Sequence, residues 1–176
     1  MGFQIESLIP SNNHLGEGPI WDDQSQTLFW VDGTGNRVGK PSIWKMDYAS
    51  QKISSWYLDK DIGAMTIRHD GNAVLALSDG FYSFNFSDES LEPIVLIDED
   101  NARIRLNDGK TDRRGRFIVG GMDDKEEHDI CSLWCLSPNL SVTQLETNII
   151  CSNGPCWSPD NSIFYFADTF KQCFSS

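Results

Sequence analysis

Apolar residues in this chain come in short runs that are rich in β-branched and aromatic side chains. Gly, Pro, Asp and Asn break these runs, and the pattern is typical of strands joined by turns rather than of amphipathic helices. One layout recurs: a polar turn, a short apolar run, and then a small or acidic residue that ends the run. Its copies occupy residues 22–32, 68–80, 112–123 and 158–168. Steps of 45, 43 and 47 residues separate the matching positions Leu28, Ala73, Arg116 and Ile163.

Further strand-like runs complete each period. After the repeated segment comes a second run (42–47, 80–85, 131–137) and then a third (52–58, 92–98, 141–147). A fourth precedes the repeated segment at 64–68 and at 105–112. A period of about 45 residues with about four antiparallel strands is typical of a β-propeller blade. A single β-sandwich with accidental spacing is the alternative, but the matching internal elements favour the propeller, so we predict an all-β chain.

The predicted blades give one partial propeller domain over residues 1–176. Three of them occupy roughly residues 16–62, 63–105 and 106–150, and residues 151–176 begin a fourth. Because a propeller needs at least four blades to close, we expect part of a longer propeller or a truncated product. An open array exposes strand edges and blade faces, so we also expect self-association through the open edge. The ending "TFKQCFSS" lacks the expected strand, which suggests a frameshift, an early stop or a fragment.

Polar residues beside glycine recur at matching places in three of the repeats. They are Glu17 in "GEGPIW", Asn107 in "LNDGK" and Asn153 in "SNGPCW". In a propeller these positions fall near the innermost strands, where side chains from different blades converge on the central channel. One carboxylate and two amide oxygens suit Ca²⁺, Mg²⁺ or Mn²⁺, and Zn²⁺ where few ligands leave open positions. Each residue taken alone is better explained as a turn residue, and only the matching placement of all three favours a site. The second repeat ("DIGAM") has no equivalent.

The same stretches resemble the regucalcin/gluconolactonase/luciferin-regenerating-enzyme family of six-bladed propellers. The segments that carry the resemblance are "LGEGPIWDDQSQTLFWVD", "RLNDGKTDRRGRFIVGGM" and "SNGPCWSPDNSIFYFAD". They match the family in order and spacing from residue 15 to about residue 169. The resemblance implies hydrolysis of a sugar lactone or related cyclic ester with one divalent cation, which polarises the carbonyl group and its bound water.

The resemblance also implies roles for particular residues. Glu17 and Asn153 match metal ligands of the family, Asn107 matches a residue at both metal and substrate, and Arg105 matches a substrate-binding arginine. The catalytic Asp of the family, a metal ligand and general base, would lie about fifty residues beyond Asn153, outside this chain. Asp124 or Glu126 is a candidate for a further substrate-binding acid.

Charge and cysteine content narrow the class of protein. The formal net charge is −12, which disfavours nucleic acid and anionic membranes as partners. The acidic run 123–129 is expected to be a solvated loop between strands. The five cysteines form no C-x-x-C pair, so we expect reduced, mostly buried thiols. With no basic, apolar leader at the start of the chain, we expect a cytoplasmic protein.

Two functions follow from these observations. The first is a metal-dependent lactonase acting on a small sugar-derived substrate. The second is a truncated or non-catalytic propeller fragment that serves as a calcium-binding or interaction module. A nucleophile hydrolase is disfavoured because the sequence contains no G-x-S-x-G and its histidines have no triad context.

Overall fold

The computed structural model describes residues 9–33, 39–98 and 100–175, whose regular elements are β-strands in antiparallel sheets. The first sheet contains β1 (Gly16–Asp22), β2 (Thr27–Asp32), β3 (Ser42–Asp47) and β4 (Ile53–Tyr57). The second contains β5 (Ile62–Ile67), β6 (Ala73–Leu77), β7 (Gly80–Phe84) and β8 (Leu91–Leu96). The third contains β9 (Ile104–Thr111), β10 (Phe117–Asp123), β11 (Cys131–Leu136) and β12 (Val142–Ile149). The fourth contains β13 (Ser152–Trp157), β14 (Phe164–Asp168) and β15 (Cys173–Ser175).

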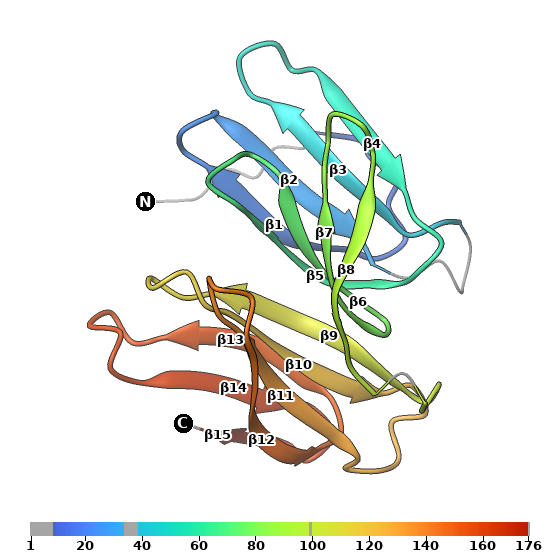
Figure 1. Cartoon of the computed structure of the whole chain (residues 1–176), viewed down its shortest axis with the longest axis vertical. Coiled ribbons are helices and arrows are strands. Elements are labelled where there is room, and N and C mark those ends of the chain that lie inside the picture. Colours follow the sequence, from blue (N-terminus) through green and yellow to red (C-terminus); the bar gives the residue numbers. More distant parts are fainter. Residues whose placement is uncertain (1–8, 34–38, 99, 176) are drawn as a thin grey trace, which may run out of the picture.

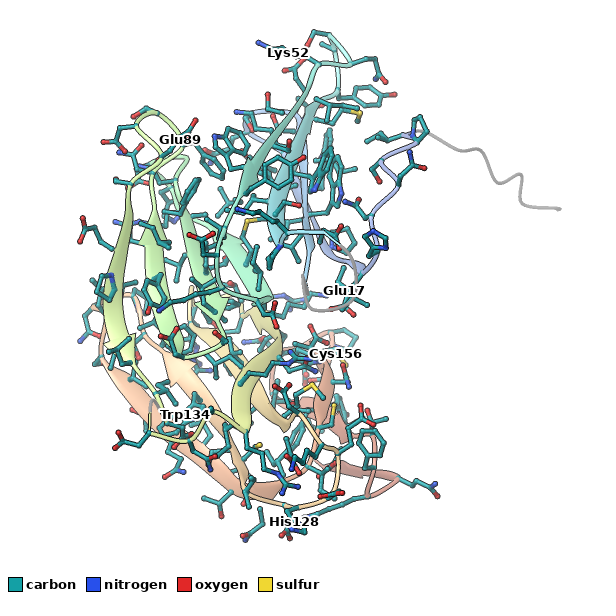
Figure 2. All side chains as sticks on the ribbon, turned by 90° about the vertical axis from the view of Figure 1, so that its right-hand side faces the viewer. Glu17, Lys52, Glu89, His128, Trp134 and Cys156 are labelled. Carbon is teal, nitrogen blue, oxygen red and sulfur yellow. The ribbon has the colours of Figure 1, made fainter. Side chains whose placement is uncertain are left out.

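The sheets follow one another in chain order, from the blue first sheet to the red fourth sheet (Figure 1). They lie around an arc, and Figure 2 shows its open side between the first and the fourth sheet. The first strand of a sheet contacts the first strand of the next: β1 meets β5, β5 meets β9, and β9 meets β13. We call these four the inner strands. Neighbouring sheets with converging first strands have the arrangement of propeller blades.

Burial explains why the repeated apolar runs are the strongest signal in the sequence. All residues of β6 and β10 are buried, because each of these second strands lies between neighbouring sheets. By contrast, most of β12 is exposed. Apolar clusters fill the space between consecutive sheets, around Leu75 between the first two, Phe117 between the next two and Leu133 between the last two. A strand buried on both faces needs apolar residues at successive positions, not at alternate ones.

In the first and the fourth sheet, the second strand ends in an aspartate. Its side chain binds the backbone just before the inner strand of the same sheet. Asp32 is buried and accepts hydrogen bonds from the backbone N–H groups of His14 (3.1 Å) and Leu15 (2.8 Å), just before β1. Asp168 accepts two backbone N–H bonds just before β13 in the same way. These contacts fix where each inner strand begins, and so they help to position the residues near its start.

Asp123 does not belong to a solvated loop, so that part of the prediction for run 123–129 was wrong. Its side chain is fully buried and accepts a hydrogen bond from Arg103 Nη2 at 2.6 Å. Arg103, with three backbone N–H donors, holds the pKa of Asp123 well below its usual range. Residues 124–129 are exposed as expected. The charge of Asp123 is tolerated inside because every acceptor has a donor.

The expectation that "TFKQCFSS" lacks a strand was also wrong. The backbone of β15 pairs with β14, with Ala167 opposite Phe174. A short edge strand pairs through its N–H and C=O groups, and it needs no apolar run of the kind that marks a buried strand. None of the described residues forms a helix long and apolar enough to cross a membrane.

Candidate metal and substrate site

Each inner strand has an irregular register near its start. The pairing shifts between Glu17 and Ile20 in β1, between Ile62 and Ala64 in β5, and between Asn153 and Cys156 in β13. In β9 the shift lies opposite Val119–Gly121 and takes in Asn107 and Asp108. A β-bulge bends its strand and re-aims side chains, and bulges are frequent beside active sites. The three residues predicted to bind a cation therefore lie at matching bulges of three different sheets.

Local sequence explains two of these bulges. Gly18 (φ +56°) follows Glu17, and Gly154 (φ +65°) follows Asn153, so both glycines occupy the left-handed region. A residue with a Cβ atom is sterically strained in this region, whereas glycine is not. The shared pattern of a polar residue, glycine and proline is thus the sequence signal of a bulge that turns the polar side chain.

The second sheet contributes no equivalent polar side chain, and its packing explains why. Gly63 lies at the bulge of β5, and a Cβ there would come within 2.4 Å of the Asn107 carbonyl oxygen and 2.5 Å of that of Leu106. Only glycine lets β5 approach β9 this closely. The backbone of the second sheet therefore supports Asn107 instead of adding a ligand of its own.

Asn107 and Asn153 meet across the third and fourth sheets. Asn107 Nδ2 donates to the Ser152 carbonyl oxygen at 3.0 Å and approaches Asn153 Oδ1 at 3.4 Å. Arg105 Nη1 donates to Asn107 Oδ1 at 3.0 Å. The structure thus brings Arg105, Asn107 and Asn153 into one hydrogen-bonded cluster.

Glu17 faces this cluster from the first sheet. Its Oε2 atom lies 3.9 Å from the position that a Cβ on Gly33 would take. Although the residue is exposed, partial burial of its carboxyl group raises the pKa, the charge of Asp108 raises it further, and Arg105 lowers it. The two charges that act on Glu17, those of Asp108 and Arg105, both belong to β9 of the third sheet.

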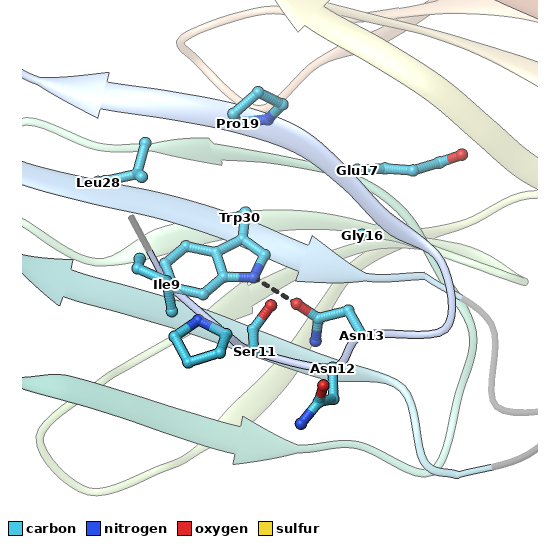
Figure 3. Close-up of a pocket in the computed structure, with 10 residues that line it drawn as sticks. Ile9, Ser11, Asn12, Asn13, Gly16, Glu17, Pro19, Leu28 and Trp30 are labelled. Atoms are coloured by element: carbon cyan, nitrogen blue, oxygen red, sulfur yellow. Dashed lines mark hydrogen bonds between the residues drawn. The ribbon is translucent and has the colours of Figure 1, made fainter. Parts of the chain in front are cut away.

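A separate pocket of about 530 Å³ lies on the other side of β1. Trp30 and Leu28 contribute to its wall, and Trp30 Nε1 donates to Asn13 Oδ1 at 2.8 Å. Figure 3 shows the Glu17 side chain extending away from Trp30 and toward the neighbouring sheets. Most of the pocket therefore lies on the outer flank of the first sheet, and Glu17 is the one residue that it shares with the candidate cation site.

Asp108 belongs to the same group of residues but was not predicted from the sequence, because "NDG" is typical of an ordinary turn. Its Oδ2 accepts a hydrogen bond from the backbone N–H of Gly154 at 2.7 Å, which ties β9 to the bulge of β13. It also acts on Glu17 through its charge. The sequence offered one indication of this role, the position of Asp108 directly after Asn107. Both residues lie within the same bulge of β9.

Of the two candidate acids in the loop after β10, the structure links one to the site. Asp124 Oδ1 accepts a hydrogen bond from Arg105 Nε at 2.8 Å. Glu126 is exposed, and its backbone N–H donates to the Asp123 carbonyl oxygen at 2.8 Å. Arg105 is thus held on one side by Asp124 and on the other by Asn107.

The donor set fits a hard divalent cation. It offers the Glu17 carboxylate and the amide oxygens of Asn107 and Asn153, and Asp108 adds a second negative charge close by. Two neighbouring carboxyl groups and a raised Glu17 pKa mark a place where a positive charge would be favourable. Among the described residues no three His, Cys, Asp or Glu side chains form a metal-binding group, so amide oxygens are needed to complete a site.

Comparison with known proteins identifies the family. The model of the family described as "SMP-30/Gluconolactonase/LRE-like region" matches residues 15–176. The chain belongs to this family. The resemblance inferred from the three sequence segments is therefore confirmed.

Individual members of the SMP-30/gluconolactonase/LRE-like family agree with this membership. Regucalcin of Xenopus laevis is 33% identical over 174 residues, which is 96% of this chain and 56% of the relative. A regucalcin structure from Agrobacterium tumefaciens, described as a calcium-binding protein, has 26% identity and a TM-score of 0.82, covering 92% of this chain and 53% of its own. A luciferin-regenerating enzyme has 29% identity and a TM-score of 0.80, covering 91% and 54%. The chain spans about half the length of these relatives.

These likenesses confirm the predicted fold class, an all-β partial propeller. The roles of Glu17, Asn107, Asn153 and Arg105 as ligands and substrate contacts stay predictions. The sequence expectation of reduced thiols agrees with Cys131, Cys135 and Cys151, which are buried and free, whereas Cys156 is free but exposed.

Proposed function

We propose that this chain is the cation-binding part of a gluconolactonase-type hydrolase, with Glu17, Asn107 and Asn153 holding one divalent cation. The observation that carries the proposal is the convergence of matching bulges from three sheets on one place. Ordinary turn residues are not expected to recur at the same bulge in several sheets. Nor are they expected to contact one another there, as Asn107 and Asn153 do. Family membership supports the reaction class.

We favour Ca²⁺ as the cation, with Mn²⁺, Mg²⁺ and Zn²⁺ as the alternatives to be titrated. Carboxylate and amide oxygens are hard ligands, which calcium accepts in flexible numbers. The related Agrobacterium regucalcin is described as calcium-binding, which is consistent with this choice.

In the proposed hydrolysis, the cation and the side chains have different roles. A bound divalent cation supplies Lewis-acid polarisation of a carbonyl group and lowers the pKa of water. The side chains of this chain bind and orient: Arg105 offers guanidinium donors to an anionic or polyhydroxylated substrate. Beside Arg105 lies a pocket of about 280 Å³, lined also by carboxylates such as Asp98 and Asp124. Carboxylates accept hydrogen bonds from hydroxyl groups, so this pocket suits a polyhydroxylated molecule, although of the proposed site residues only Arg105 and Asp124 line it.

The alternative is a cation-binding module without turnover. The chain spans about half the length of its regucalcin relatives, so the activity of the whole protein does not carry over to it directly. Cation affinity and lactone hydrolysis must therefore be measured on the same protein, because only the second quantity separates the two functions.

The test compares wild type with Glu17→Gln, which removes the charge and keeps the shape. We expect Glu17→Gln to lower Ca²⁺ affinity in calorimetry by roughly tenfold or more, since a charged ligand is lost. Glu89→Gln is the matched control, because Glu89 lies in an exposed turn on the far side of the arc from Glu17 (Figure 2). Equal Ca²⁺ affinity in all three proteins would contradict the cation site.

Hydrolysis of an aldonolactone, followed by release of acid, then distinguishes enzyme from module. Cation-dependent turnover that is lost in Glu17→Gln supports the hydrolase. Cation binding without turnover supports the module.

A further inference from the structure

Cys151 lies next to both amide side chains of the candidate site. It is buried in the short link between β12 and β13, and its backbone forms a bridge with Met122. Its Sγ atom lies 3.3 Å from Asn153 Nδ2 and 3.8 Å from Asn107 Nδ2. The nitrogen ends of both amides therefore turn toward one sulfur atom.

The other partners of these amides agree with this orientation. Asn107 Nδ2 also donates to the Ser152 carbonyl oxygen at 3.0 Å, which can only accept. Asn153 Nδ2 donates to Thr169 Oγ1 at 2.9 Å. Rotating the Asn107 amide by half a turn would set its oxygen against the Ser152 carbonyl oxygen. Rotating the Asn153 amide would set its NH₂ group against that of Asn107, which now donates to Asn153 Oδ1. The direction of the two amides thus decides whether oxygens or hydrogens face a cation.

We propose that Cys151 is a positioning residue of the cation site, whose sulfur accepts hydrogen bonds from both amide NH₂ groups and so fixes which end of each amide faces the cation. The cation part of this inference rests on the proposed function, whereas the amide contact is a property of the chain itself. The sulfur lies against the NH₂ ends of the amides, so its role is that of an acceptor for them and not of a cation ligand. Hard cations have little affinity for sulfur in any case.

The experiment compares Cys151→Ala, Cys151→Ser and a control variant, Cys135→Ala. Cys135 is equally buried in the third sheet, so its removal costs similar packing without touching the site amides. We expect Cys151→Ala to weaken Mn²⁺ or Ca²⁺ binding about tenfold, the lower end of the usual effect of removing a partner of a metal ligand. Cys151→Ser keeps an acceptor and should stay within about threefold of wild type.

A second readout does not depend on the cation. In ¹⁵N spectra of the metal-free protein, the side-chain NH₂ signals of Asn107 and Asn153 should shift and exchange faster with water in Cys151→Ala, and remain unchanged in Cys135→Ala. Identical behaviour of the two alanine variants in both measurements would overturn the inference. If the amide signals respond as expected but wild type binds no cation, the amide contact is supported and the proposed cation site is overturned.

Discussion

At the scale of single residues, Glu17 carries the charge on which the proposed site depends. Partial burial and the neighbouring charge of Asp108 both favour the protonated form, while Arg105 favours the ionised form. A cation at the site would reverse this balance, because it interacts with the carboxylate and not with the neutral acid. Proton and cation therefore compete for Glu17.

This competition predicts the pH dependence of cation affinity. Affinity should be constant at high pH, where Glu17 is already ionised, and should fall as pH decreases through its raised pKa. The onset of the fall should lie above about 4.3, the ordinary pKa of glutamate. Calorimetric Ca²⁺ titrations at a series of pH values measure it.

Asp108→Asn sharpens the same experiment. It removes the repelling charge and keeps an acceptor for the Gly154 N–H, so the onset should move to lower pH. Asp70→Asn, in the exposed turn between β5 and β6, is the control and should leave the onset where it is. An onset at or below the ordinary glutamate value in wild type would contradict the coupling of Glu17 to Asp108.

At the level of the strands, the bulges of β1, β9 and β13 bring one polar residue from each of three sheets toward the same region. A regular strand would send alternate side chains to opposite faces, toward one neighbouring sheet or the other. The extra residue at the bulge breaks that alternation and directs Glu17, Asn107 and Asn153 to the region where the sheets converge. The buried aspartates Asp32 and Asp168 fix the chain just before two of these strands.

Replacing Gly18 by alanine tests the bulge. A Cβ at Gly18 would meet no atom within 4 Å, so the cost is backbone strain at φ +56°, about 1–2 kcal/mol. Gly71 (φ +82°) also has open space around it, but lies in the turn between β5 and β6. Both variants should lose stability in denaturant unfolding, Gly18→Ala at least as much because Pro19 follows. Only Gly18→Ala should weaken Ca²⁺ binding severalfold; equal binding by both would exclude a role for the bulge.

Sequence patterns predicted the strands and their grouping well, for a physical reason. Second strands such as β6 and β10 are buried on both faces, so their apolar runs stand out and repeat at the blade period. Glu17 and Asn153 were found through the glycine and proline that follow them. The resemblance to a known family then supplied the proposed chemistry.

Other features depend on partners that are remote in sequence. Asp123 looked like part of a polar loop, because its burial depends on Arg103, twenty residues earlier. Asp108 looked like a turn residue, because its partner Gly154 is forty-six residues away. The strand β15 was missed because its pairing with β14 joins backbone groups, which the pattern of side chains does not reveal. The pattern of apolar and polar side chains indicates which residues of a strand are buried. It does not indicate which residues from other strands they contact.

At the scale of the whole molecule, the arc has two end sheets with apolar surface. On the first sheet Trp21 and Tyr48 are exposed and pack edge to face. On the fourth, Tyr165 and Phe170 are exposed. In a closed ring the flanks of end blades are covered by neighbours, so this 176-residue chain by itself presents faces suited to a further sheet.

We therefore propose that the isolated chain self-associates through these flanks. Static light scattering should give an apparent mass that rises above 19.9 kDa with increasing protein concentration. Trp21→Ser should reduce the rise, because it removes exposed aromatic surface from one flank. A mass that stays at the monomer value over the whole concentration range would contradict association.

The central claim is that three sheets hold one divalent cation between Glu17, Asn107 and Asn153. Anomalous diffraction at the manganese edge, from crystals grown with Mn²⁺, tests it most directly because it locates the cation without assuming its ligands. We expect a peak bounded by the Glu17 carboxylate and the two amide oxygens, and loss of that peak in Glu17→Gln. An empty site between these residues, with manganese only on the exposed acidic loop 124–129, would contradict it.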